Sequence, residues 1–152
     1  MDLDAYDRHI LDVLQTDGRI SNVELAEKVG LSAAPCWRRV RTLEAQGVVR
    51  SYVALLDPVK LGLGLRAFVH VSLDLHHADA FEADILKRPE VIECYAMTGD
   101  QDYLLHVLVN DMASFDSFVR NHLIRMPGVD RVRSSFTLTV VKQTTAMLVP
   151  KA

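Results

Sequence analysis

Three arginines lie within four positions of the sequence, at Arg38, Arg39 and Arg41. A guanidinium group presents paired N–H donors that match phosphate oxygens and the edge of a guanine base, so this cluster could contact DNA. The alternative is a basic helix face that meets only solvent. The segment carries three positive charges against the single acid Glu44, although the whole chain has a net charge of −3. This local excess of positive charge favours a nucleic-acid contact.

The arginines are predicted to lie on a helix that starts after a tight turn. Ser32 is placed to cap this helix, which is expected to run to about Gln46. At about 100° per residue, one side of the helix is apolar and the other is open to a ligand. The inward residues are Cys36, Val40 and Leu43, and the outward residues are Ala34, Arg38 and Arg41.

Two further helices are predicted to precede this one. Apolar residues recur every three or four positions over residues 3–14, which is the spacing of an amphipathic helix. Ser21 and Glu24 fit a capping box for a second helix, which ends before Gly30. Because only residues 30–32 join the second and third helices, the pair is predicted to be a helix-turn-helix.

This motif predicts a set of DNA-contacting residues. Helix N-termini hold phosphates, and the outward face of the third helix would enter the major groove. Trp37 lies at the edge of the inward side and is either a packing residue or a contact to thymine methyls and sugars. The predicted DNA-binding residues are Ser21, Asn22, Ser32, Ala34, Trp37, Arg38, Arg39 and Arg41.

The rest of the chain reads first as extended structure and then as alternating strands and helices. Residues 48–56 are predicted to form a wing or hinge strand, and residues 58–64 a connector. Strands are then expected over 65–75, 91–98, 103–109 and 129–141, with helices over 78–87 and 112–125. The order β-α-β-β-α-β predicts an α+β fold in which a ferredoxin-like sandwich places both helices on one face of a four-stranded antiparallel sheet.

Three segments follow from this reading. They are a DNA-binding domain over residues 1–50, a hinge strand and connector over 51–64, and a second domain over 65–152 that binds an effector and oligomerises. Residues 104–105 and 107–109 are apolar at consecutive positions, whereas a strand with one face in water should alternate. The sheet face without helices is therefore expected to be covered by another subunit in an obligate dimer.

The sequence Gly99-Asp100-Gln101-Asp102 joins two predicted strands. A glycine lets backbone amides approach a ligand, and short carboxylates can receive the ammonium group of a free amino acid. The alternative is a simple hairpin turn, which composition alone favours. Ser134 and Ser135 add hydroxyls on the last strand, where such residues commonly face solvent.

Other chemistry is not indicated. The six histidines show no metal-ligand spacing, and no phosphate loop or nucleophile elbow is present, so we expect neither an enzyme nor a metal site. Cys36 and Cys94 are far apart and are expected to be core thiols. The chain is 49% hydrophobic but has no apolar run long enough for a membrane span, and its acidic start is unlike a secretory signal. We therefore expect a cytoplasmic protein without a membrane partner.

With these motifs placed, the chain resembles the leucine-responsive regulator family, which is also called the Lrp/AsnC or feast/famine family. The resemblance covers essentially the whole chain and is highly specific because many short matches occur in order. The matching segments are residues 3–4, 7–11, 17–21, 24–26, 29–32, 35–36, 38–40, 43–44, 47, 52, 99–100, 102–104 and 127–129.

The resemblance implies a winged helix-turn-helix joined to a ferredoxin-like effector domain. Family dimers pair through their sheets, often assemble into octamers that wrap DNA, and bind effector amino acids between dimers near the loop that matches residues 99–102. No other cofactor is implied. The implied effector-binding residues are Gly99, Asp100, Asp102, Tyr103, Ser134 and Ser135.

We therefore expect a sequence-specific transcription regulator that binds a near-palindromic site on double-stranded DNA and responds to a small effector, an amino acid. The alternative is an architectural protein that bends or compacts DNA without responding to a metabolite.

Overall fold

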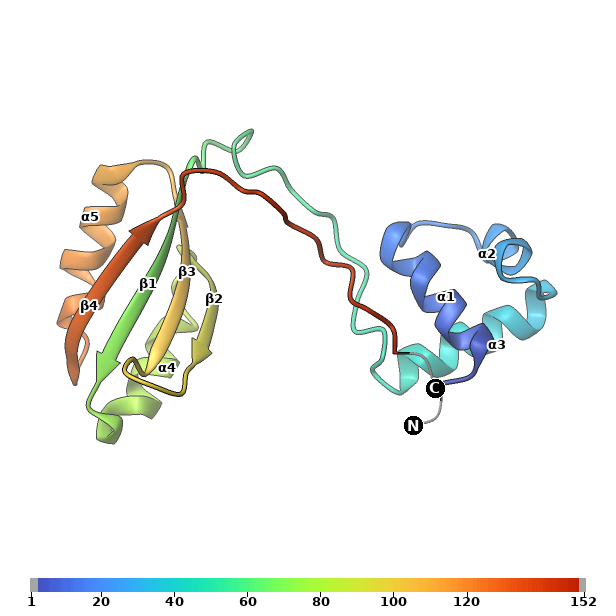
Figure 1. The fold of residues 1–152 in the computed structure, drawn as a ribbon, viewed down its shortest axis with the longest axis horizontal. Coiled ribbons are helices and arrows are strands. Elements are labelled where there is room, and N and C mark those ends of the chain that lie inside the picture. The colour runs from blue at the N-terminus through green and yellow to red at the C-terminus, as the bar shows by residue number, and fades with distance from the viewer. Residues whose placement is uncertain (1–2, 151–152) are drawn as a thin grey trace. The chain divides into compact units, whose positions relative to one another are not determined.

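The computed structural model describes residues 3–150, which form two compact units (Figure 1). The first unit contains the residues up to Leu55 together with those from Lys142 on, and the second runs from Leu56 to Val141. The structure thus groups the C-terminal segment with the first unit, whereas the sequence analysis placed it in the second domain. The reason is a contact between Gln15 and Met147, which are 132 positions apart in the sequence.

The first unit is a three-helix domain built from α1 (Ala5–Thr16), α2 (Asn22–Val29) and α3 (Ala33–Ala45). The capping box predicted at Ser21 is present, and Asp4 forms a second one at the start of α1. Gly30 ends α2 in the left-handed conformation, with φ at 76°. The helices enclose a core of Ile10, Leu11, Leu25, Ala26, Val29, Cys36 and Leu43.

The strand expected after Gly47 is not formed. Residues 50–57 are not assigned to a strand, and Val53, Leu55 and Leu56 are exposed. A strand needs a neighbouring backbone to satisfy its N–H and C=O groups, and none of the described strands pairs with residues 50–57.

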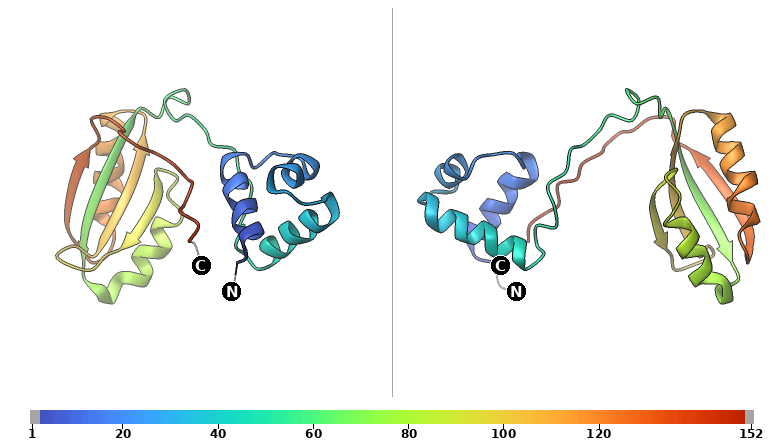
Figure 2. Two further views of the ribbon diagram at one scale, coloured as in Figure 1. Left: turned by 45° about the vertical axis from the view of Figure 1, so that its right-hand side comes forward. Right: turned by 180° about the vertical axis from the view of Figure 1, so that it is seen from behind.

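The second unit is the predicted ferredoxin-like sandwich (Figure 2). Its elements follow in the order β1 (Leu65–Leu73), α4 (Ala78–Ile85), β2 (Val91–Ala96), β3 (Tyr103–Val109), α5 (Met112–Asn121) and β4 (Val129–Phe136). The strands form one antiparallel sheet in the order β2-β3-β1-β4. Alternate residues of β1 face the helices, and they pack against Phe81 and Phe118 in a single core.

All the predicted elements of this unit except β3 end earlier than expected, α5 and β4 by the most. The helix predicted to reach Arg125 ends at Asn121, because His122 leaves helical geometry with φ at −123°. The strand predicted to reach Val141 ends at Phe136, which pairs with Ala67 near the start of β1. Beyond it the N–H of Thr137 still donates to the carbonyl oxygen of Arg66 over 3.0 Å, and no further backbone hydrogen bond joins residues 138–141 to β1 in the described chain.

Candidate DNA-binding surface and effector site

The N-termini of α2 and α3 lie side by side in the first unit. The Nδ2 group of Asn22 donates to the carbonyl oxygen of Ala33 over 2.8 Å and ties the two helix starts together. Ser21 and Ser32 are the N-cap residues of α2 and α3. The side chain of Ser32 makes no capping bond with the helix, so the predicted cap is correct in position but not in its hydrogen bond. Two sets of free helix N–H groups therefore point to one surface, which suits an anion.

Ser21 is already engaged within its own helix. Its hydroxyl donates to Oε2 of Glu24 over 2.7 Å and accepts from the Glu24 amide over 3.2 Å. The side-chain bond from Ser21 lowers the pKa of Glu24, so this carboxylate stays charged and the cap persists in mild acid.

The helix α3 has the inward and outward sides that its sequence predicts. Cys36 and Leu43 are buried, whereas Ala34 and Arg38 are exposed. Trp37 is 55% exposed, which places most of its ring outside the core. The exposed side of α3 therefore presents a small residue, an aromatic ring and a cation to solvent.

The three arginines of α3 differ in what holds them. Arg39 lies 2.8 Å from both Asp4 and Asp7. Arg41 pairs with Glu44 at 3.0 Å, and its side chain is 64% exposed. Arg38 is exposed and makes no ion pair within the described residues. Charge counting alone treats the three as equal, but the structure leaves Arg38 with the freest guanidinium.

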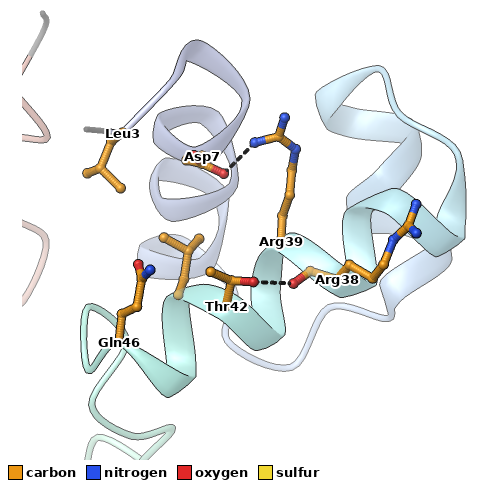
Figure 3. Close-up of a pocket in the computed structure, with 7 residues that line it drawn as sticks. Leu3, Asp7, Arg38, Arg39, Thr42 and Gln46 are labelled. Carbon is orange, nitrogen blue, oxygen red and sulfur yellow. Dashed lines mark hydrogen bonds and ion pairs between the residues drawn. The ribbon is translucent and has the colours of Figure 1, made fainter. Parts of the chain in front are cut away.

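Arg39 is held by α1 and by the segment before it. Figure 3 shows its guanidinium directed at Asp7, whereas that of Arg38 points away. Its guanidinium carbon also lies 5.5 Å from the ring centre of Tyr6, in the range of a cation–π contact. The hydrogen bond to Asp7 is the main cause that raises the pKa of Arg39. These residues border a depression of about 480 Å³ lined by Leu3, Asp7, Arg38, Arg39, Thr42, Leu43 and Gln46.

The loop predicted to bind an effector packs against the end of β1 in the second unit. Oδ2 of Asp102 accepts from the Leu73 amide over 2.7 Å, and Ser72 Oγ donates to Gln101 Oε1 over 3.3 Å. Gly99 has φ at 116° and open space where a Cβ would lie. Asp100 is exposed and makes no hydrogen bond or ion pair within the described residues. The loop is therefore anchored at its end by Asp102 and open at Gly99 and Asp100.

A pocket of about 500 Å³ lies between the end of β1 and the start of β4, and no residue of the loop lines it. Its lining residues come from the end of β1 and the start of β4, and they are Ser72, Leu73, Asp74, Gly128, Val129 and Asp130. The sequence analysis did not name these residues. Their turn-forming types were visible, but only the sheet order places the two strand ends together.

None of the predicted effector residues lines this pocket. Tyr103 is buried, and its hydroxyl donates to Glu82 Oε1 over 2.6 Å. Burial, with this hydrogen bond, raises the pKa of Tyr103 to about 12. Ser134 and Ser135 pair with Val69 and Phe68 of β1, so their side chains point to opposite faces of the sheet. The structure thus joins the loop to Ser72 and Leu73, which line the pocket, but brings neither the loop nor the serines into its lining.

The two cysteines differ in their exposure. Cys36 is buried as expected, but Cys94 is exposed on β2 and is not a core thiol. Within residues 3–150, no group of three histidine, cysteine or acidic side chains is arranged to hold a metal ion. No helix among the same residues has the length and apolar character of a membrane span.

Two family models match the chain, one to each part of the fold. Residues 3–50 match a winged helix-turn-helix DNA-binding domain, and residues 66–147 match the Lrp/AsnC ligand binding domain. The chain belongs to the Lrp/AsnC family. The resemblance predicted from the sequence is thereby confirmed, as is the fold of a helix-turn-helix followed by a ferredoxin-like domain.

Curated relatives and solved structures agree with this Lrp/AsnC membership. The leucine-responsive regulatory proteins of Escherichia coli K12 and Salmonella typhimurium are each 44% identical to this chain over 151 residues, covering 97% of it and 92% of the relative. A transcriptional regulator from Neisseria meningitidis, solved in complex with L-methionine, has a TM-score of 0.94 and 46% identity and covers 97% of both chains. An AsnC family regulator from Agrobacterium tumefaciens has a TM-score of 0.90 and 40% identity, covering 95% of this chain and 96% of its own. This Lrp/AsnC protein is therefore a transcription regulator with a DNA-binding domain and a ligand-binding domain.

Proposed function

We propose that this regulator binds a near-palindromic DNA site through α3 and that a free amino acid, bound in the second unit, changes its DNA binding or its assembly. The observation that carries the DNA contact is the unpaired, exposed Arg38 beside the joined N-termini of α2 and α3. A duplex would receive the helix N-termini at its phosphates and the outward face of α3 in its major groove.

The proposed DNA-contact set gives the three arginines different tasks. Arg38 contacts a base edge or a phosphate directly. Arg41 does so after leaving Glu44, since an exposed ion pair of this kind contributes little. Arg39 positions α3 against α1 through Asp4 and Asp7, and contributes to DNA binding mainly by holding the helix in place.

The proposed effector site is the pocket at the ends of β1 and β4 with the adjoining loop. Asp100 and Asp130 are exposed carboxylates without a hydrogen bond or ion pair in the described chain, so either can receive an ammonium group. The open space at Gly99 lets a ligand carboxylate approach the backbone. The L-methionine bound by the Neisseria regulator supports an amino acid as the ligand class.

The proposed assembly is a dimer that buries the sheet face opposite the helices. This face carries Phe68, His70, Leu104, His106 and Leu108, which face the same side through the β1–β3 register. Phe68 is 37% exposed and stacks on the ring of His106 at 4.8 Å. Nε2 of His106 is buried without a hydrogen-bond partner among the described residues, and a second copy can supply one. Such dimers then assemble further, to an octamer.

The test has two parts. A duplex selected by the protein from a random pool should bind more tightly than the same bases in scrambled order, and the selected sequence should have two-fold symmetry. Calorimetry against the twenty amino acids, with light scattering, should then show that one of them binds and shifts duplex affinity or assembly. Only a ligand with different affinities for the two states can do this. Equal binding to all duplexes and no response to any amino acid would favour the architectural alternative.

A further inference from the structure

The side chain of Gln15 on α1 binds the backbone of the C-terminal segment. Its Nε2 donates to the carbonyl oxygen of Met147 over 3.0 Å, and its Oε1 accepts from the Met147 amide over 2.5 Å. A glutamine amide has one acceptor and one donor end, so it can satisfy both backbone groups of a single residue. Gln15 therefore recognises an extended peptide in the way a neighbouring strand would.

A second contact holds the same segment. Val149 packs against the core of the helix-turn-helix unit. In contrast, the side chains of Met147 and Leu148 are 75% and 91% exposed. The segment is thus held by one residue's backbone and one apolar side chain, and the side chain of Met147 itself plays no part.

We propose that this face of α1 is an interaction surface whose occupant is residues 144–149 of the same chain, which tie the DNA-binding unit to β4. The chain passes between the two units twice, after Leu55 and after Val141. The second passage starts from β4, which ends at Phe136. The DNA-binding unit is therefore connected to the ligand-binding unit at two points, not one.

Two connections restrict the DNA-binding unit more than one linker does. A unit on a single extended linker can turn freely, whereas a unit held at both of its chain crossings can adopt only the orientations that both crossings can span. A shift of β4 at the pocket residues Val129 and Asp130 would then reach α1 through the C-terminal segment. This link to the effector rests on the proposed function, but the docking and the second connection do not.

Docking is tested on the full chain without DNA or ligand, by hydrogen exchange of the Met147 amide, which donates to Gln15. We expect slow exchange in the natural chain, and on the order of tenfold faster exchange in Gln15→Ala, since two hydrogen bonds are lost. Met147→Ala keeps the backbone and is the matched control, with no change expected. Exchange as fast as in an unstructured peptide, or equal exchange in Gln15→Ala and the natural chain, would overturn the proposal.

The occupant is tested by cross-linking cysteines placed at positions 16 and 148 with a short bismaleimide. These exposed positions adjoin Gln15 and Met147 and leave the hydrogen bonds of Gln15 intact. Cys94 is exposed and is first replaced by serine, whereas Cys36 is buried. A product with the mass of one chain supports docking within the chain. A product with the mass of two chains would assign the segment to a second copy and overturn the assignment.

The second connection is tested through Trp37, the only tryptophan of the chain, which lies on α3 in the DNA-binding unit. Time-resolved fluorescence anisotropy reports how freely this unit turns. Gln15→Ala should add a faster component to the slow decay, and Met147→Ala should not. If Gln15→Ala leaves the anisotropy decay unchanged but speeds hydrogen exchange in the C-terminal segment, docking does not restrain the unit. That result would overturn this part of the proposal. None of these readouts uses DNA or an amino acid, so their failure is distinct from failure of the proposed function.

Discussion

Replacing Arg38 with alanine should weaken duplex binding without destabilising the protein. The guanidinium of Arg38 is exposed and has no ion-pair partner in the described chain, so the fold loses little when it is removed. Surface substitutions of this kind usually change the free energy of unfolding by no more than about 0.5 kcal/mol. A base contact made by an arginine contributes about 1 to 3 kcal/mol to binding, which corresponds to a roughly 5- to 150-fold increase in Kd.

Arg39 provides the matched control on the same helix. Its guanidinium lies 2.8 Å from Asp4 and from Asp7, and the Asp7 side chain is only 17% exposed. Arg39→Ala leaves both carboxylates without their cation and should lower the melting temperature of the helix-turn-helix unit. At temperatures where this variant is still folded, its Kd for the duplex should rise less than that of Arg38→Ala.

Fluorescence anisotropy with a labelled selected duplex measures the Kd over a range of salt concentrations, and circular dichroism measures the melting temperature. If Arg38 contacts a phosphate, Arg38→Ala should weaken selected and scrambled duplexes equally and reduce the slope of log K against log salt by about 1. If it contacts a base, the selected duplex should lose more affinity. Duplex affinity unchanged by Arg38→Ala, or a larger loss in Arg39→Ala than in Arg38→Ala with both variants folded, would refute the assignment.

Three further predictions concern the ligand-binding unit. Burial and the bond to Glu82 raise the pKa of Tyr103 to about 12, so the neutral phenol stabilises the fold fully below the ordinary pKa of 10.0, and this stability is lost as the pH rises from there through 12. Urea unfolding at pH 9 and at pH 11 should show this loss of stability in the natural chain and a smaller loss in Tyr103→Phe. Phe81→Ala empties a fully buried site and should cost about 3 to 5 kcal/mol in denaturant unfolding, and a cost below about 1 kcal/mol would contradict the core described here. Gly128 has φ at 81°, and a Cβ there would lie 2.7 Å from Cβ of His77, whereas Gly30 has φ at 76° and no atom within 4 Å of such a Cβ. Gly128→Ala should therefore lower the free energy of unfolding more than Gly30→Ala does. Equal losses in the two variants would show that the close contact with His77 does not matter.

Features set by neighbouring residues could be predicted from the sequence. The capping box at Ser21 depends only on residues three positions apart, and the left-handed end at Gly30 depends on one residue. The inward side of α3 followed from helical periodicity, with Cys36 and Leu43 buried as expected. In each case the physical cause lies within one or two helical turns, so the local sequence contains it.

Features set by distant residues could not be predicted in this way. Arg39 is engaged by Asp7, which is 32 positions away, so nothing in the residues around Arg39 separates it from Arg38. The end of β4 depends on its register with β1, because only residues that lie beside the neighbouring strand can pair with it. The pocket at the ends of β1 and β4 exists because the strand order brings Asp74 and Asp130 together. Before the strand order is known, nothing distinguishes these two residues from other turn-forming residues in the sequence.

The uncovered sheet face has a consequence for how much of this regulator the cell must keep. If a second copy covers Phe68 and the buried ring nitrogen of His106, folding and pairing are one equilibrium, and the population of intact protein depends on how much protein is present. Each tenfold dilution then removes about 1.4 kcal/mol from the stability of the pair. A drop in synthesis would thus lower the number of molecules and also the share of them that is folded, so that the response to scarcity is steeper than linear.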